Sequence, residues 1–93
     1  MHYYMVSYDQ STPVEKYDAL IDEIKARPTQ LWAKVLLSCF IIGTNESTAQ
    51  VYARLRQRLD SNNFFIVMKV CRPHHGWLQK EVHDWIDTHV PFR

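Results

Sequence analysis

Residues 3–9, with the sequence YYMVSYD, decide how the rest of the chain is interpreted. The run is apolar and aromatic at nearly every position, which is typical of a strand that is covered on both faces. We therefore expect a strand over 2–8 that ends at a single carboxylate, Asp9. A carboxylate held at the end of a central strand is well placed to bind a metal or to transfer protons. The alternative is that Asp9 only caps the turn that follows the strand.

The first helix is expected to begin at Thr12. Thr12 and Glu15 stand three residues apart, which is the spacing of a capping box at a helix N-terminus. The helix is expected to end at Pro28, because the residue before a proline is disfavoured in helical geometry. Its apolar stripe at helical spacing consists of Val14, Tyr17, Leu20, Ile21 and Ile24.

The second helix is expected over 47–59. Ser47 and Gln50 form another capping-box pattern at its start. The side chains expected to face the core are Val51, Tyr52, Leu55 and Leu59.

Two further regions have the composition of strands. Region 31–43 is too long for one ordinary strand, so we expect either two short antiparallel strands with a bend near Ser38 or one long strand with a bulge. Residues 64–71, FFIVMKVC, predict another strand. A third helix is expected over 77–89. Its apolar face consists of Leu78, Val82, Trp85, Ile86 and His89.

The predicted order is strand, helix, two strands, helix, strand and a final helix. This is the ferredoxin-like βαββαβ pattern of the α+β class, a four-stranded antiparallel sheet with two helices on one face. We expect one domain over 1–93, with a core of 1–71 and an appended C-terminal helix at about 74–90. Either the appended helix or a second protomer covers the other face of the sheet.

The bulk composition indicates a small globular domain. Of 93 residues, 46% are hydrophobic and 13% aromatic, and the formal net charge is +1. A chain of this size buries only about 60–65% of its unfolded surface, so self-association is a natural supplement. The near-zero charge argues against strong non-specific attraction to nucleic acid.

Targeting and redox signals are few. The longest apolar run, 35–42, is far shorter than the ~20 residues that cross a membrane, and no signal peptide is recognised. We therefore expect a cytoplasmic protein without a membrane partner. Cys39 and Cys71 match no zinc motif and are expected to be reduced core residues.

Two short motifs resemble a known family. Tyr8-Asp9 at the end of the first strand and Ser38-Cys39-Phe40 in the second strand region resemble the small CRISPR-associated nuclease-like subunit of the spacer-acquisition complex, over about residues 1–71. The chain is more similar still to stand-alone bacterial relatives of that family, whose C-terminal helix opens with Gly-Trp-Leu, here 76–78. VapD-like ribonuclease toxins resemble it more distantly, through the fold and the strand-end Asp.

The resemblance implies a homodimer with facing sheets. Asp9 from each copy would share a Mg²⁺ or Mn²⁺ ion that activates water against a phosphodiester of RNA or DNA. Tyr8, Ser38 and Phe40 match the family motifs and would flank this site. The chain departs from the family in two places. Polar and acidic residues follow the strand-end Asp where basic ones are usual, and Ile41 stands where an acid often follows.

Other side chains suggest nucleic-acid contacts. Arg54 and Arg58 share a helix face and could contact phosphates, although such a pair is also an ordinary solvated surface. Trp77 lies off the apolar stripe of the third helix and could stack on bases or form an interface. His74 and His75 could bind a metal or transfer protons, but capping the third helix or contacting a dimer partner suits a loop position better.

Three functions remain open from the sequence. The first is a homodimeric, metal-dependent endonuclease or endoribonuclease that acts through Asp9. The second is a non-catalytic dimeric scaffold of the same fold that binds nucleic acid or protein. The third is a regulatory module that binds a small ligand at the dimer interface. The fold alone does not choose among them, because ferredoxin-like domains host many functions.

Overall fold

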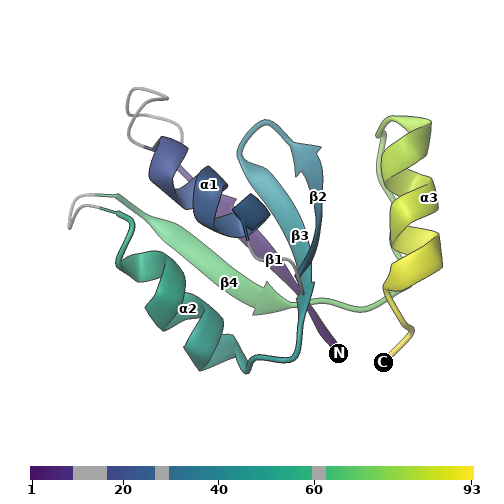
Figure 1. Cartoon of the computed structure of the whole chain (residues 1–93). Coiled ribbons are helices and arrows are strands. Elements are labelled where there is room, and N and C mark those ends of the chain that lie inside the picture. Colours follow the sequence, from purple (N-terminus) through teal and green to yellow (C-terminus); the bar gives the residue numbers. More distant parts are fainter. Residues whose placement is uncertain (10–16, 27–29, 60–62) are drawn as a thin grey trace.

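The fold is known from a computed structural model that describes residues 1–9, 17–26, 30–59 and 63–93 (Figure 1). The elements follow the predicted order, which confirms the α+β class and the ferredoxin-like succession βαββαβ with one added helix. The predicted start of the first helix at Thr12 lies outside the described residues. The elements are β1 (His2–Tyr8), α1 (Asp18–Ala26), β2 (Leu31–Leu36), β3 (Cys39–Thr44), α2 (Thr48–Arg56), β4 (Phe65–Lys69) and α3 (Lys80–His89).

The four strands form one antiparallel sheet in the order β2-β3-β1-β4. The strand β1 is therefore central, as its apolar sequence predicts. Region 31–43 forms a hairpin, and the register of β2 against β3 also shifts between Lys34 and Leu36. The alternative of two short antiparallel strands with a bend is thus confirmed, and that of one long strand is wrong, although the hairpin also has an irregularity in its register.

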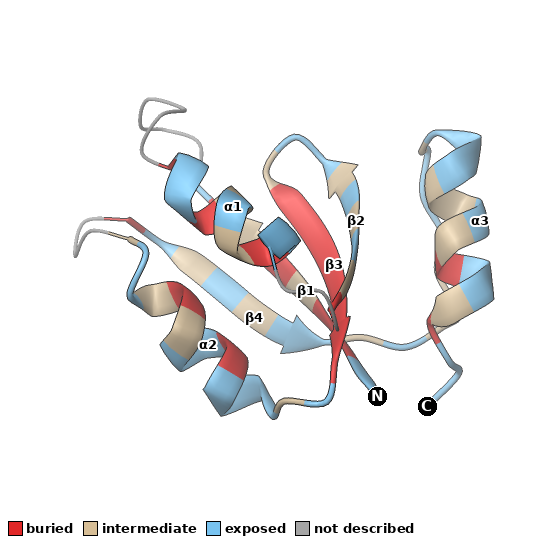
Figure 2. Ribbon diagram, viewed as in Figure 1, coloured by how far each residue is buried: buried red, intermediate tan, exposed pale blue. Residues whose placement is uncertain are grey.

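The helices α1 and α2 cover one face of the sheet (Figure 1). Successive side chains of a strand point to opposite faces, so the even-numbered residues of β1 share one core with the apolar faces of these helices. Figure 2 shows buried residues gathered along β3 and the inner sides of the helices. This core consists of Tyr4, Val6, Tyr8, Tyr17, Leu20, Ile24, Phe40, Ile42, Val51 and Leu55.

The helix α2 begins with the predicted capping box. The Ser47 hydroxyl accepts a hydrogen bond from the backbone N–H of Gln50 at 3.2 Å, and the Gln50 side-chain oxygen accepts one from the backbone N–H of Ser47 at 2.8 Å. Two orphan N–H groups at the start of the helix are thereby satisfied.

The helix α3 packs on the opposite face of the sheet (Figure 1). The Tyr3 ring of β1 meets the Trp85 ring of α3 edge-on, with centroids 6.2 Å apart. Most of the predicted apolar face of α3 is used here. The cluster consists of Tyr3, Ile41, Ile86 and Val90, with Leu31, Val35, Val70, Leu78, Val82 and Trp85 partly buried around them.

Three predictions about individual residues are wrong. Tyr52 is exposed, and its ring stacks on Phe65 with centroids 5.3 Å apart, because it lies at the rim of the α2 stripe rather than on it. Cys71 is exposed, since it follows the end of β4, although both cysteines are free as predicted. The helix α3 begins at Lys80 rather than Trp77, and Gln79 occupies the N-cap in an extended conformation. None of the described helices is long and apolar enough to cross a membrane.

Candidate interaction site on the uncovered half of the sheet

Part of the sheet face that carries α3 is left open. The helix contacts the β2 side of the sheet, and the β1–β4 side beyond Tyr3 has no cover among the described residues. We call this area the uncovered half-face. It consists of Met5, Ser7, Asp9, Phe64, Ile66 and Met68.

The strand register builds the uncovered half-face. Met5 is paired with Met68 and Ser7 with Ile66, so their side chains stand in two rows on the same side of the sheet. Ile66 and Met68 are each 49% exposed. Phe64, just before β4, is 73% exposed. Three large apolar side chains, two on the edge strand β4 and one just before it, are thus in contact with water.

Asp9 lies at one end of the uncovered half-face. Its backbone N–H donates a hydrogen bond to the Phe64 carbonyl at 3.1 Å, which fixes the chain where β1 ends. Asp9 is exposed, as predicted for an acidic residue at the end of a strand. Beside it is a shallow hollow of about 370 Å³, lined by Ser7, Tyr8, Asp9, Phe64, Phe65 and Ile66.

The structure separates Asp9 from two of its predicted partners. The Tyr8 ring lies in the core beneath α1, stacked on Tyr17 with centroids 4.5 Å apart, and its hydroxyl donates to the Leu37 carbonyl at 3.3 Å. Loss of hydration on burial, together with the neighbouring Tyr17 and Cys39, raises the pKa of the Tyr8 phenol. Phe40 is fully buried in the same core. Both rings therefore sit on the face opposite Met5 and Ser7.

Ser38 lies in the bend between β2 and β3 and is half-buried. Its carbonyl accepts a hydrogen bond from the backbone N–H of Tyr8 at 3.0 Å. This backbone hydrogen bond places the Ser38-Cys39-Phe40 motif next to the Tyr8-Asp9 motif. Of the four residues predicted for catalysis, Asp9 and Ser38 keep side chains partly open to solvent.

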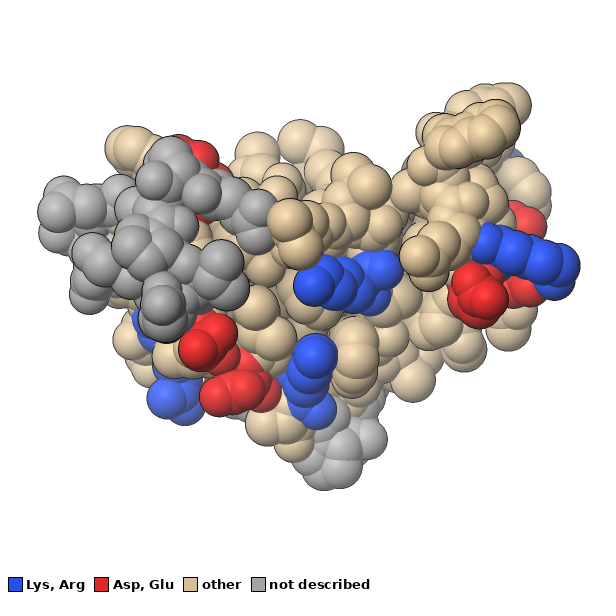
Figure 3. Space-filling view, turned by 90° about the horizontal axis from the view of Figure 1, so that it is seen from above, with Lys and Arg blue, Asp and Glu red and all other residues tan. Residues whose placement is uncertain are grey.

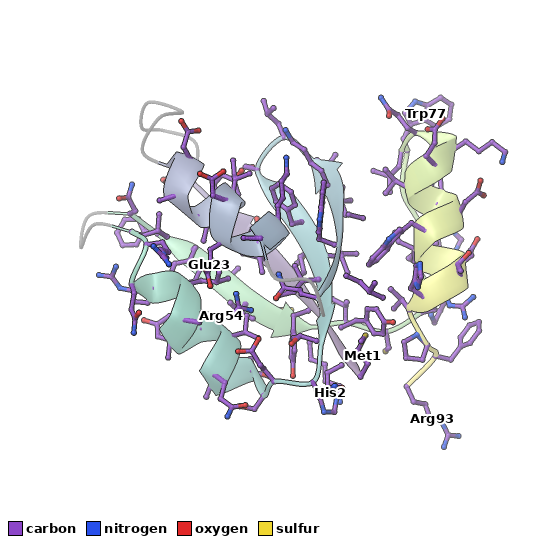
Figure 4. All side chains as sticks on the ribbon, in the orientation of Figure 1. Met1, His2, Glu23, Arg54, Trp77 and Arg93 are labelled. Atoms are coloured by element: carbon purple, nitrogen blue, oxygen red, sulfur yellow. The ribbon has the colours of Figure 1, made fainter. Side chains whose placement is uncertain are left out.

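Arg54 is a structural residue between α1 and α2. Its side chain is only 9% exposed, and its guanidinium contacts Glu23 at 3.2 Å and Glu46 at 2.8 Å (Figure 4). It also donates to the Gln30 side-chain oxygen at 2.6 Å. The group that was predicted to contact phosphates is thus engaged inside the protein. No local sequence pattern could indicate this, because Glu23 is 31 residues away.

Of the other residues predicted for nucleic-acid binding, the structure brings Arg58 next to Arg54, but not Trp77. Arg58 is 52% exposed and lies 3.2 Å from Glu23, so the two arginines share one carboxylate between α1 and α2. Trp77 is completely exposed and extends beyond the first turn of α3, on the other side of the sheet (Figure 4). The three side chains therefore do not form one surface.

Figure 3 gives the charge distribution on the face seen from above. Its Lys and Arg side chains stand apart among uncharged atoms and do not form a continuous basic stripe. A basic stripe is the usual electrostatic footprint of a nucleic-acid-binding domain.

The histidines join the loop before α3 to the helix. The His74 Nε2 and His83 Nδ1 atoms lie 2.9 Å apart, and the two rings stack. The other ring nitrogen of His74 lies 4.0 Å from Asp87, so its two nitrogens face different partners. Within the described ranges, no group of three or more His, Cys, Asp or Glu side chains is placed to hold a metal ion.

Comparison with known proteins gives no family for the chain: no protein-family model, curated protein or solved structure matches it significantly.

Proposed function

We propose that this chain forms a homodimer through the uncovered half-face and works as a non-catalytic, protein-binding scaffold. The observation that carries the proposal is the row of exposed apolar side chains along the edge strand β4 and just before it, which are Phe64, Ile66 and Met68. Contiguous apolar surface of this kind on a small domain marks an interaction site. A chain of 93 residues also gains stability when it buries more surface than its own core allows.

The shape of this face favours a second copy as the occupant. The helix α3 packs on β2 and on the Tyr3 and Val70 end of the β1–β4 side, and it leaves the rest of that side open, so the face has the form of a step. A two-fold axis places the step of one copy into the step of the other, with the two half-faces packed on each other. A stable interface takes about 600–800 Å² from each partner, roughly a tenth of the 6100 Å² surface of this chain.

The burial of Tyr8 and Phe40 favours a scaffold over an enzyme. Both side chains belong to the α1 and α2 core and offer no reactive group at the half-face. The engagement of Arg54 by Glu23 and Glu46 favours a protein partner over nucleic acid, because it takes a phosphate-binding group away from the surface.

The proposal is tested by charging the half-face. Ile66→Glu places a carboxylate in the proposed interface, where an unpaired buried charge is costly, and we expect light scattering to find the variant monomeric. Tyr52→Glu is the matched control, since Tyr52 is also an exposed aromatic or aliphatic side chain but lies on α2, and we expect it to leave the dimer intact. If light scattering gives the mass of a monomer for the wild type as well as for both variants, the proposal is contradicted.

A metal-dependent endonuclease is the second candidate, and the position of Asp9 favours it. Asp9 lies at the rim of the proposed interface, so a two-fold axis near that rim would bring two carboxylates together. Magnesium or manganese is commonly held by one or two carboxylates together with substrate phosphates of RNA or DNA. The resemblance to the CRISPR-associated nuclease-like family belongs to this candidate.

The two candidates differ in what Asp9→Asn does. If the chain is a nuclease, purified wild type cleaves labelled single-stranded RNA or double-stranded DNA with Mg²⁺ or Mn²⁺, EDTA stops the reaction, and Asp9→Asn abolishes it while the dimer remains. If the chain is a scaffold, neither protein cleaves. Equal cleavage by both proteins points to a contaminating enzyme and also counts against the nuclease.

A further inference from the structure

A second surface lies at the opposite edge of the sheet. A groove of about 340 Å³ runs between the outer end of β2 with its turn and the segment that leads into α3. It is separate from the uncovered half-face, because β2 and β4 are the two outer strands. The residues that line it are Lys34, Val35, Leu36, Leu37, Trp77, Leu78, Gln79 and Val82.

The lining of the groove is apolar and exposed. Leu36 and Leu37 are exposed on the hairpin, and Trp77 is 100% exposed across from them. Tryptophan is highly buried on average in folded proteins, and it is among the residues that most often dominate the energy of a protein interface. Trp77 therefore has the character of an anchor for a partner.

The edge of β2 determines the form of that partner. In the described part of the chain, β2 pairs with β3 alone, so the outer backbone N–H and C=O groups of this edge strand have no neighbouring strand beside the groove. An extended peptide can add to such an edge as a fifth strand and place alternate side chains in neighbouring pockets.

The charge of the groove determines the chemistry of the partner. Among the described residues, Lys34 is the only charged one that lines it. A carboxylate among the apolar side chains of the peptide would meet Lys34.

We propose that the groove between the β2 edge and Trp77 binds an extended peptide segment of another protein that combines apolar side chains with one acidic residue. This inference names the partner class for the scaffold role proposed above, but it uses a different surface and does not need the dimer.

The test uses two labelled peptides of about nine residues, each an alternation of leucine and threonine with either aspartate or lysine at the centre. Fluorescence anisotropy is expected to show binding of the aspartate peptide by wild type at least tenfold tighter than that of the lysine peptide. Lys34→Glu reverses the preference, and Lys69→Glu on the other outer strand leaves it unchanged. Trp77→Ala weakens binding at least tenfold, whereas Phe92→Ala, which removes another exposed aromatic ring, has no effect.

Three results overturn the inference. They are no binding of either peptide up to about millimolar concentration, no effect of Lys34→Glu on the preference, and displacement of the peptide by a single-stranded oligonucleotide, which assigns Trp77 to nucleic acid. Light scattering on the same samples reports separately on the proposed dimer, because the groove and the uncovered half-face share no residue. Loss of peptide binding can therefore be distinguished from loss of the dimer.

Discussion

Arg54 is the residue whose role in the fold differs most from its appearance in the sequence. Its guanidinium joins Glu23 of α1 to Glu46 before α2 and is almost fully buried. Loss of the Arg54 cation takes a charged partner away from two largely buried carboxylates, which is costly. We expect Arg54→Gln to lower the free energy of unfolding by about 3 kcal/mol, measured by urea denaturation.

Arg58→Gln is the matched control for this prediction. Arg58 contacts the same Glu23 but is half exposed, so solvent screens the pair and we expect a loss within about 1 kcal/mol. Similar losses for both variants would show that burial of Arg54 contributes nothing beyond a surface ion pair.

The two cysteines should differ in reactivity. Burial raises the pKa of the Cys39 thiol, so less of it is thiolate at any given pH than in an exposed cysteine. Cys71 is exposed. With an aromatic disulfide reagent at pH 8, we expect Cys39→Ser to react quickly and Cys71→Ser slowly, and the rate of Cys71→Ser to rise only at higher pH. Equal rates at pH 8 would contradict the burial of Cys39.

The strands and helices were largely predictable because their signals are local. A continuous run of apolar and β-forming residues indicated the bounds of β1, and the capping box of Ser47 and Gln50 indicated the start of α2. The start of α3 was not predictable in the same way. Leu78 continues the apolar spacing of the helix, but it lies before the first helical residue and reaches the sheet from outside the helix.

The contact between α3 and the sheet depends on Gly43 of β3. A Cβ atom at Gly43 would lie 2.6 Å from Cε1 of the Tyr3 ring, and that ring packs against Trp85 of α3. We expect Gly43→Ala to push Tyr3 toward α3 and to cost about 1–3 kcal/mol in the free energy of unfolding. Urea denaturation followed by tryptophan fluorescence measures the loss.

Gly76→Ala provides the comparison. Its Cβ would meet only Leu78 at 3.4 Å and 3.5 Å, which is close to ordinary contact, so we expect little change in stability. If Gly43→Ala were as stable as Gly76→Ala, the close packing of Tyr3 under α3 would be wrong.

At the scale of the whole molecule, the decisive feature is the division of one sheet face between α3 and open surface. The sequence predicts an amphipathic third helix and an apolar sheet, and it left open whether the helix or a second protomer covers the far face. The structure leaves space for both the helix and a second protomer on this face, because α3 covers the β2 side and leaves Ile66 and Met68 exposed. How far a helix of ten residues reaches across a sheet depends on the path of residues 70–79, which no local pattern encodes.

The candidate site was predictable only in part, for a related reason. Asp9 could be placed at a strand end from its position after β1. Whether the Tyr8 and Phe40 side chains are buried depends on which face of the sheet α1 and α2 cover. A strand that is apolar at nearly every position has no polar alternation to indicate which of its faces the helices cover.

The central claim is that two copies meet through the uncovered half-face, and NMR on a mixture of isotope-labelled and unlabelled chains tests it most directly. We predict intermolecular contacts from the methyl groups of Ile66 and Met68, in a particle of twice the 11.1 kDa chain mass. Absence of such contacts in a sample that tumbles as a monomer, or contacts that arise only from Leu37 and Trp77, would contradict the claim.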